Sequence, residues 1–219
     1  MSEAKQKRGA ETQERLMRAA EHLVANLGIE NVTVRAIIQA AGQKNESALQ
    51  YHFKNREGLL NAVHAQRNAE ARALREALAA PFLAGKTPNL RDLCYIMIVP
   101  SFELAQQDQG FRDYIRGFGP RVAQSSRPVE MMFDTTNAEV AAFVFRQLQQ
   151  QLGHLPADLV RLRLESTLRF ASLCMSHQAG RENGFAERAG KLFVANLLDA
   201  MVGILTAPAS TETMALFKL

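Results

Sequence analysis

The chain has 219 residues, enough for one or two globular domains with a substantial buried core. Its 47% hydrophobic and 22% charged residues are typical of a soluble globular protein, and its net charge of +4 permits a polyanionic partner without requiring one. The longest uncharged apolar run, Leu93–Phe102, is too short to cross a bilayer, and the polar N-terminus has no signal-peptide core, so we expect a cytoplasmic protein.

Apolar residues at three- and four-residue steps predict helices along the whole chain, and no strand-type alternation or fixed-period repeat is visible. The first helix is expected over 11–27, up to a glycine stop. Three residues suited to N-terminal caps, Thr33, Asn45 and Asn55, then predict a helix to 41, a helix to about 52, and a long helix that ends at Pro81.

The rest of the chain shows longer helical stretches with wider apolar faces. The breaks between them fall at "GFGP", "SSRP", "GHLP" and "GRENG", which are rich in turn-forming residues. Between these breaks we expect helices at 89–107, 110–118, 128–152, 156–182 and 185–206. Pro100 should break the first of these helices, and the tail from Pro208 should be loose. The fold class is therefore all-α.

Residues 33–53 read as two short helices bent around Gly42, which tolerates the positive φ of a tight turn. Apolar residues of both helices would pack against the helix over 11–27. This leaves the outer face of the second helix free, and it carries Lys44, Asn45, Ser47, Gln50 and Tyr51.

Such side chains can bond base edges or phosphates in a major groove, as in a DNA-binding helix-turn-helix. Thr33 and Arg35 begin the preceding helix, where they could hold a backbone phosphate together with free amide N–H groups. His52, Lys54 and Arg56 could grip the same strand further along. The alternative interpretation is a helical hairpin of a larger bundle whose polar residues are simply solvated.

The segments "TVRAIIQAAG" and "YHFKNREGLL" resemble the N-terminal domain of TetR-family transcriptional regulators over about residues 12–62. The resemblance implies DNA contacts by Arg35, Tyr51, His52 and Arg56. Two features depart from the family pattern. Gly42 and Phe53 lie eleven residues apart instead of ten, which predicts a longer turn at "QKN", and Gln50 stands where most members have a phosphate-binding tyrosine.

The resemblance also implies how the chain is divided. We expect a helix-turn-helix DNA-binding domain at 9–56, a larger helical effector-binding and dimerisation domain at 57–207, and flexible tails at 1–8 and 208–219. The first tail contains "AKQKR", which suits either a basic arm or a solubilising tail. Members of the family are mostly repressors that bind a palindromic operator as dimers and release it on binding a small molecule.

Within the second domain, the last two long helices carry enough apolar residues for a four-helix interface with a second copy. These residues are Leu159, Leu162, Leu168, Leu173, Phe193, Leu197, Leu198, Met201 and Ile204. An apolar effector pocket would take its walls from phenylalanine, methionine and a few polar side chains, although each of them suits a plain core equally well. The candidates are Met97, Phe102, Phe111, Phe118, Phe143, Phe170, Cys174 and His177.

Enzyme motifs are missing from the sequence. There is no GxSxG, no P-loop and no GxGxxG that opens a helix, and the five histidines form no i, i+4 pair. Cys94 and Cys174 lie in apolar stretches and form no CxxC, which favours buried, reduced thiols over a disulfide and makes a metal site improbable. We expect no catalytic residues and no cofactor. An all-helical enzyme or adaptor that does not bind DNA is the competing interpretation.

Overall fold

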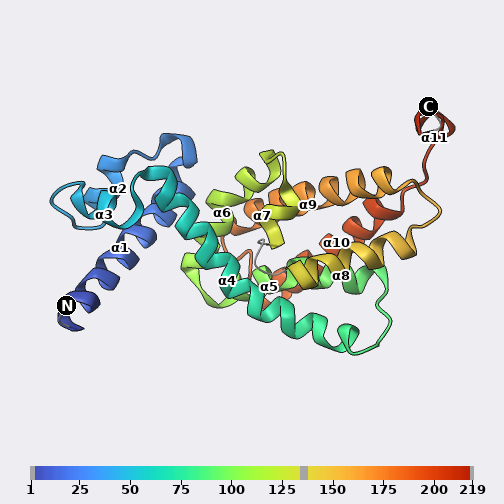
Figure 1. Ribbon diagram of the computed structural model, residues 1–219, viewed down its shortest axis with the longest axis horizontal. Coiled ribbons are helices and arrows are strands. Elements are labelled where there is room, and N and C mark those ends of the chain that lie inside the picture. Colours follow the sequence, from blue (N-terminus) through green and yellow to red (C-terminus); the bar gives the residue numbers. More distant parts are fainter. Residues whose placement is uncertain (1–2, 134–137, 218–219) are drawn as a thin grey trace.

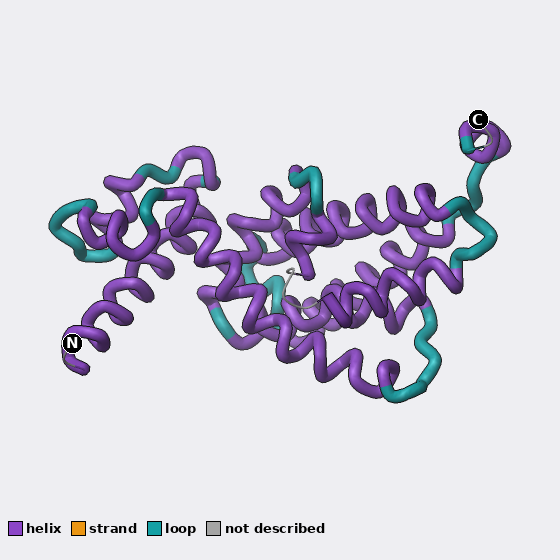
Figure 2. Tube along the Cα trace, viewed as in Figure 1, coloured by secondary structure: helices purple, strands orange, loops and turns teal. Residues whose placement is uncertain are grey.

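The computed structural model describes residues 3–133 and 138–217, and these residues form helices and loops without strands, as predicted for an all-α protein. The N-terminal unit consists of α1 (Glu3–Leu27), a 3-10 turn (Ile29–Asn31), α2 (Val34–Ala40) and α3 (Ser47–Phe53). It forms one end of an elongated molecule, and α4 (Arg56–Leu83) leads from it into the helical body (Figures 1 and 2).

The body is a layered bundle of the remaining helices, in which α6 packs against both α1 and α9. The C-terminal helix α11 stands away from the bundle at the end opposite the N-terminal unit (Figure 1). The helices are α5 (Leu90–Gln107), α6 (Gln109–Gln124), α7 (Pro128–Phe133), α8 (Ala138–Gln151), α9 (Ala157–Ala179), α10 (Glu187–Thr206) and α11 (Thr211–Leu216).

Two of the three predicted caps are confirmed. The Thr33 side chain accepts a hydrogen bond from Ala36 N, and the Asn55 side chain accepts one from Gly58 N, at 3.2 and 2.8 Å. The third prediction is wrong, because α3 begins only at Ser47 and its N-cap is Glu46. Asn45 instead accepts from Ser47 N at 3.1 Å inside the turn. The turn is long, as the eleven-residue spacing predicted.

The predicted break at "GFGP" is wrong, because α6 runs through it without interruption. A Cβ atom on Gly117 would lie 2.6 Å from Val24 Cγ1 of α1, and one on Gly119 would lie 2.7 Å from Ser176 Cβ of α9. These glycines therefore permit close helix contact on two sides and do not form a turn. Such contacts depend on distant parts of the chain and leave no local signal.

Other boundaries also differ from the predictions. Helix α1 begins at Glu3 instead of 11, and α11 occupies part of the stretch expected to be loose. Pro100 lies inside an unbroken, largely buried α5, where burial of the flanking side chains holds the helix together. The helix predicted over 128–152 corresponds to α7 and α8, and residues 134–137 between them lie outside the described residues.

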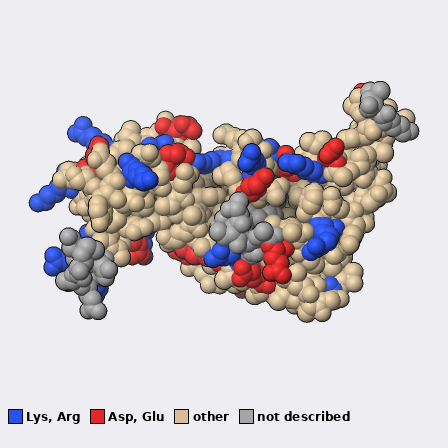
Figure 3. All heavy atoms as spheres, viewed as in Figure 1, with Lys and Arg blue, Asp and Glu red and all other residues tan. Residues whose placement is uncertain are grey.

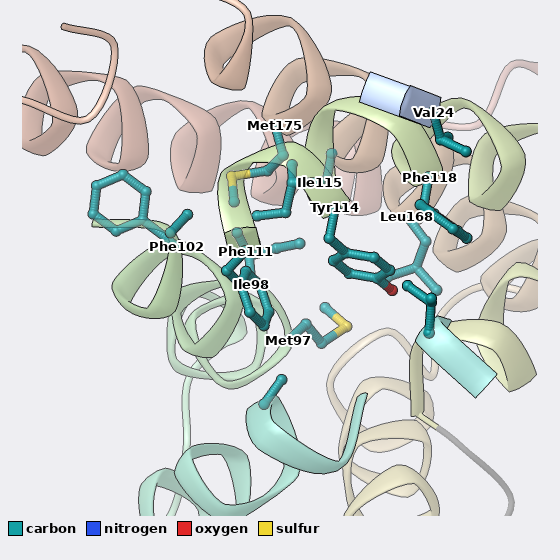
Figure 4. Close-up of a cluster of buried hydrophobic side chains, with 14 of the residues drawn as sticks. Val24, Met97, Ile98, Phe102, Phe111, Tyr114, Ile115, Phe118, Leu168 and Met175 are labelled. Carbon is teal, nitrogen blue, oxygen red and sulfur yellow. The ribbon is translucent and has the colours of Figure 1, made fainter. Parts of the chain in front are cut away.

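The core continues from the N-terminal unit into the body, because α4 contributes fully buried side chains to both. Leu59, Leu60 and Val63 have no exposed surface. Further along, α5, α6 and α9 bring large apolar side chains together (Figure 4). Both cysteines are free thiols. Cys94 is buried, whereas Cys174 is half-buried.

Helix α10 is long and apolar enough, by length and composition alone, to cross a membrane. Four of its apolar residues, Leu197, Leu198, Met201 and Leu205, are nevertheless buried in the core of the body.

The residues predicted for a dimer interface divide into two groups. Leu159 and Leu168 on α9 are buried in the core, whereas Leu162 and Leu173 are 56% and 50% exposed.

Candidate nucleic-acid interface and interior cavity

Helices α2 and α3 are fixed by their apolar faces. Ile37, Leu49 and Phe53 are nearly or fully buried in one cluster with Leu16 and other residues of α1. Gly42 has a φ of 67° at the turn after α2, a conformation that L side chains rarely adopt. The arrangement predicted from the sequence, a helix-turn-helix packed on the first helix, is therefore present.

The packing leaves one face of α3 in solvent. Ser47, Gln50 and Tyr51 are exposed on that helix, and 80% of the Tyr51 surface is accessible. Lys44 and Asn45 are also exposed, but they lie in the turn before α3 and not on the helix as predicted. Basic side chains project from this end of the molecule (Figure 3).

Three exposed residues flank the α3 face. Thr33 and Arg35 lie at the N-terminus of α2, where Thr33 uses its hydroxyl to cap the helix. Lys54 ends α3 in a left-handed conformation, with a φ of 67°. Such a bend directs the chain away from α3 and starts α4 almost at once.

His52 and Arg56 are less available than the other predicted contact residues. His52 is half-buried beside α1, where a Cβ atom on Gly9 would lie 3.8 Å from its ring. Arg56 donates hydrogen bonds to the carbonyl oxygens of Val32, at 2.7 Å, and Ile29. These bonds hold the 3-10 segment and the start of α2 against α4. Arg56 therefore fixes the position of the helix-turn-helix relative to α4.

A cavity of about 60 Å³ lies inside the body. Of the residues predicted as pocket walls, Phe111 and Phe118 line it. Met97, Phe102 and Phe143 are buried in the core outside this lining, and Phe170, Cys174 and His177 lie on α9 without reaching it. Most of the side chains labelled in Figure 4 belong to α5 and α6, and Tyr114 lies among them.

The polar part of the cavity wall comes mainly from α4, which the sequence analysis had not considered for the pocket. His64, Arg67, Asn68 and Arg75 all line the cavity. They recur at helical spacing beside the apolar stripe of α4, and this polar stripe next to an apolar one was the signal that could have identified them. Other polar residues of the wall are Ser101, Tyr114 and Ser172.

A short hydrogen-bond chain closes the cavity towards α7. The Tyr114 hydroxyl lies 2.8 Å from His64 Nδ1, and His64 Nε2 lies 3.1 Å from the carbonyl oxygen of Met131. Asn68 donates to the same carbonyl at 2.9 Å. His64 Nε2 also lies 3.1 Å from Asn68 Nδ2. In the tautomer that donates from Nε2 to the Met131 carbonyl, Nδ1 accepts from Tyr114. His64, Asn68 and Met131 also line an open groove of about 410 Å³ on the outer side.

Arg67 connects the cavity wall to the N-terminal unit. Its guanidinium donates to both carboxylate oxygens of Glu21 on α1, at 2.6 and 2.9 Å, and also to Glu70 and Asp108. Burial alone would lower the pKa of Arg67, but the hydrogen bonds to Glu21 and Glu70 outweigh burial and raise it. The same guanidinium lies over the Phe111 ring, 5.4 Å from its centroid. A movement of the cavity wall at Arg67 therefore acts directly on α1.

Comparison with known proteins supports the interpretation of the N-terminal unit. Residues 16–63 match the family model described as bacterial regulatory proteins, tetR family. The matched segment contains the C-terminal half of α1, the whole of α2 and α3, and the first turns of α4. No curated protein matches the chain.

Proposed function

Since residues 16–63 match the model of the tetR family of bacterial regulatory proteins, we propose that the chain is a dimeric repressor that binds a palindromic operator and releases it when a small, mostly apolar effector binds. The observation that carries the proposal is the exposed polar face of α3, held on a buried scaffold. Ser47, Gln50 and Tyr51 share this face. The alternative interpretation, a solvated hairpin in a larger bundle, gives no reason for these side chains to share one exposed face.

In the proposed complex, α3 enters the major groove. Gln50 and Ser47, which are exposed on α3, would reach base edges, and Lys44 would approach from the turn. Arg35 and Lys54 would hold phosphates on either side, which fixes the position of α3 without reading sequence. Tyr51 would contact the phosphate backbone from the same face, in place of the tyrosine that most members carry one position earlier.

Dimerisation is proposed through α9 and α10. Leu162 and Leu173 on α9 are at least half exposed, and Leu192 on α10 is 71% exposed. Large apolar side chains exposed together are typical of protein–protein contacts, and pairing with a second copy would bury them. Because a two-fold dimer presents two copies of α3 related by symmetry, its operator would be an inverted repeat.

The effector is proposed to bind in the cavity and to change the separation of the two DNA-binding units. Helix α4 has 28 residues, so it spans roughly 40 Å from the end of α3 along the body. A tilt at the cavity would therefore move the start of α4, and Arg67 would carry the same movement to Glu21. An effector shifts the equilibrium only as far as it prefers one separation over the other.

A mobility-shift titration of duplex DNA at several salt concentrations tests the proposed DNA binding. We expect affinity to fall steeply as salt rises, because phosphate contacts release counterions. The competing interpretation, an all-helical enzyme or adaptor, predicts no salt-dependent shift. A double variant, Arg35→Ala with Lys54→Ala, provides the control, since it should lower the salt slope by about one unit for each phosphate contact removed while keeping its fold.

A further inference from the structure

We propose that the effector carries a carbonyl-type oxygen, which takes the place of the Met131 carbonyl oxygen as the hydrogen-bond acceptor beside Asn68 and His64. This inference rests on the proposed function, since it assumes that the effector binds at the cavity. It adds one chemical group to the mostly apolar molecule proposed above, and it places that group at one position of the site.

The interior cavity and the open groove meet at three residues. Asn68, His64 and Met131 line both the cavity of about 60 Å³ and the groove of about 410 Å³. A typical ligand site has a volume of roughly 300 Å³ or more, so the cavity alone is too small for an effector. A molecule that occupies both spaces must therefore pass between these three residues.

The contact that such a molecule must open is polar. Asn68 Nδ2 donates to the carbonyl oxygen of Met131 at 2.9 Å, and His64 Nε2 lies 3.1 Å from the same oxygen. The Asn68 amide donates to this oxygen in either tautomer of His64, and in the tautomer that carries a proton on Nε2 both side chains donate to it. When a ligand displaces Met131, Asn68 loses an acceptor that it shares with His64.

The lost acceptor determines what the ligand needs at this point. Asn68 and His64 are both half-buried, and a donor that loses its acceptor in such a place costs free energy unless the ligand supplies another. An oxygen acceptor on the ligand restores the hydrogen bond, whereas a hydrocarbon group at the same point does not. A carbonyl oxygen is the closest match, because it replaces one carbonyl group by another.

The remainder of the wall suits an apolar, flat body. Ile98, Phe111, Phe118 and Met175 line the cavity together with the ring of Tyr114. Figure 4 shows these side chains in one cluster, to which α5, α6 and α9 contribute. Aromatic rings in a wall favour a flat ring system as their neighbour. The site therefore suits an aromatic carbonyl compound, with its ring in the cavity and its oxygen at Asn68.

The test compares two probes of nearly the same shape. They are 2-acetylnaphthalene and 2-isopropenylnaphthalene, in which a methylene group replaces the carbonyl oxygen. Equilibrium dialysis against the full-length protein, followed by naphthalene absorbance, gives the dissociation constant of each. We expect the ketone to bind about fivefold more tightly, which corresponds to one net hydrogen bond between neutral groups. Equal affinities, tighter binding of the alkene, or no binding of the ketone up to its solubility limit would overturn the proposal.

Variants assign the preference to Asn68. Asn68→Leu is close in size and removes the amide donor, so it should remove or reverse the preference by weakening the ketone and not the alkene. Gln66→Leu, which removes an exposed amide from the same helix, should leave both affinities unchanged. In infrared spectra, the carbonyl stretch of the bound ketone should lie at lower frequency in the native protein than in Asn68→Leu. A full preference that survives Asn68→Leu would contradict the proposal.

A further variant separates failure of the ligand class from failure of the site. Ser101 also lines the cavity, and Ser101→Phe places a ring there, which should weaken both probes together. If it does so but the probes bind equally to the native protein, the cavity binds ligands and only the carbonyl group is wrong. If both probes bind and neither responds to Ser101→Phe, the cavity is not the ligand site, and the effector-binding part of the proposed function fails with it. Circular dichroism verifies that each variant is folded.

Discussion

Gly117→Ala tests whether α6 packs directly on the backbone of α1. An added Cβ would lie 2.6 Å from Val24 Cγ1, which can rotate away, and 2.9 Å from Ala25 N, which cannot. The helices would therefore have to separate. Overpacking of this kind lowers the free energy of unfolding by about 1–3 kcal/mol. We expect the upper half of this range, because the clash is with a backbone atom. Alanine has a higher helix propensity than glycine, which offsets about 1 kcal/mol of this loss.

The net expectation is a loss of about 1–2 kcal/mol in the free energy of unfolding. Urea denaturation followed by circular dichroism, at one fixed protein concentration, measures it. Gly9→Ala is the matched control on α1, since its Cβ would meet only His52 Cε1 at an ordinary 3.8 Å. This control should be neutral or stabilised by up to about 1 kcal/mol. If Gly117→Ala is as stable as the native protein, the close contact between α1 and α6 is refuted.

Three further predictions concern separate parts of the molecule. Arg35→Ala should weaken binding to all DNA sequences about equally and flatten the salt dependence, whereas Gln50→Ala should cost on the order of 1–3 kcal/mol at particular base pairs only; if both variants discriminate among sequences just as the native protein does, α3 is not the reading helix. Leu173→Glu should shift sedimentation at micromolar concentration from dimer to monomer, and a native protein that sediments as a monomer would remove the dimer proposal. Cys174, which is half-buried, should react with a disulfide reagent in the native state. Cys94 should react only after unfolding, because burial raises the pKa of its thiol to about 12, and two fast-reacting thiols would contradict this assignment.

The N-terminal unit could be predicted closely because its signals are local. The caps at Thr33 and Asn55 and the spacing from Gly42 to Phe53 act over a few residues, and the structure has the caps and the long turn. The cap at Asn45 could not be predicted, because its side chain can satisfy either a helix N-terminus or a turn. In the long loop before α3, the Asn45 side chain accepts from Ser47 N and so stabilises the turn.

The cavity was harder to predict from sequence, because its wall depends on which face of each helix turns inwards. Phe111 and Phe118 were identified from residue type, but so were Phe170 and His177, which lie on another face of the body. Arg75 belongs to the polar stripe of α4, but such a stripe is more often a solvated face, since a buried guanidinium is rare. Only the packing of α4 against α5 and α6 places it inside.

The most direct test of the central claim is the selection of bound sequences from random duplex DNA by the full-length protein. The account predicts enrichment of one inverted repeat, whose half-sites lie about one helical turn, or a multiple of it, apart. With Gln50→Ala at the same concentration, the repeat should still be enriched, but the preference at particular base pairs of each half-site should relax. Recovery of sequences no different from the starting pool, at low and moderate salt alike, would contradict the claim that α3 reads DNA as part of a symmetric dimer.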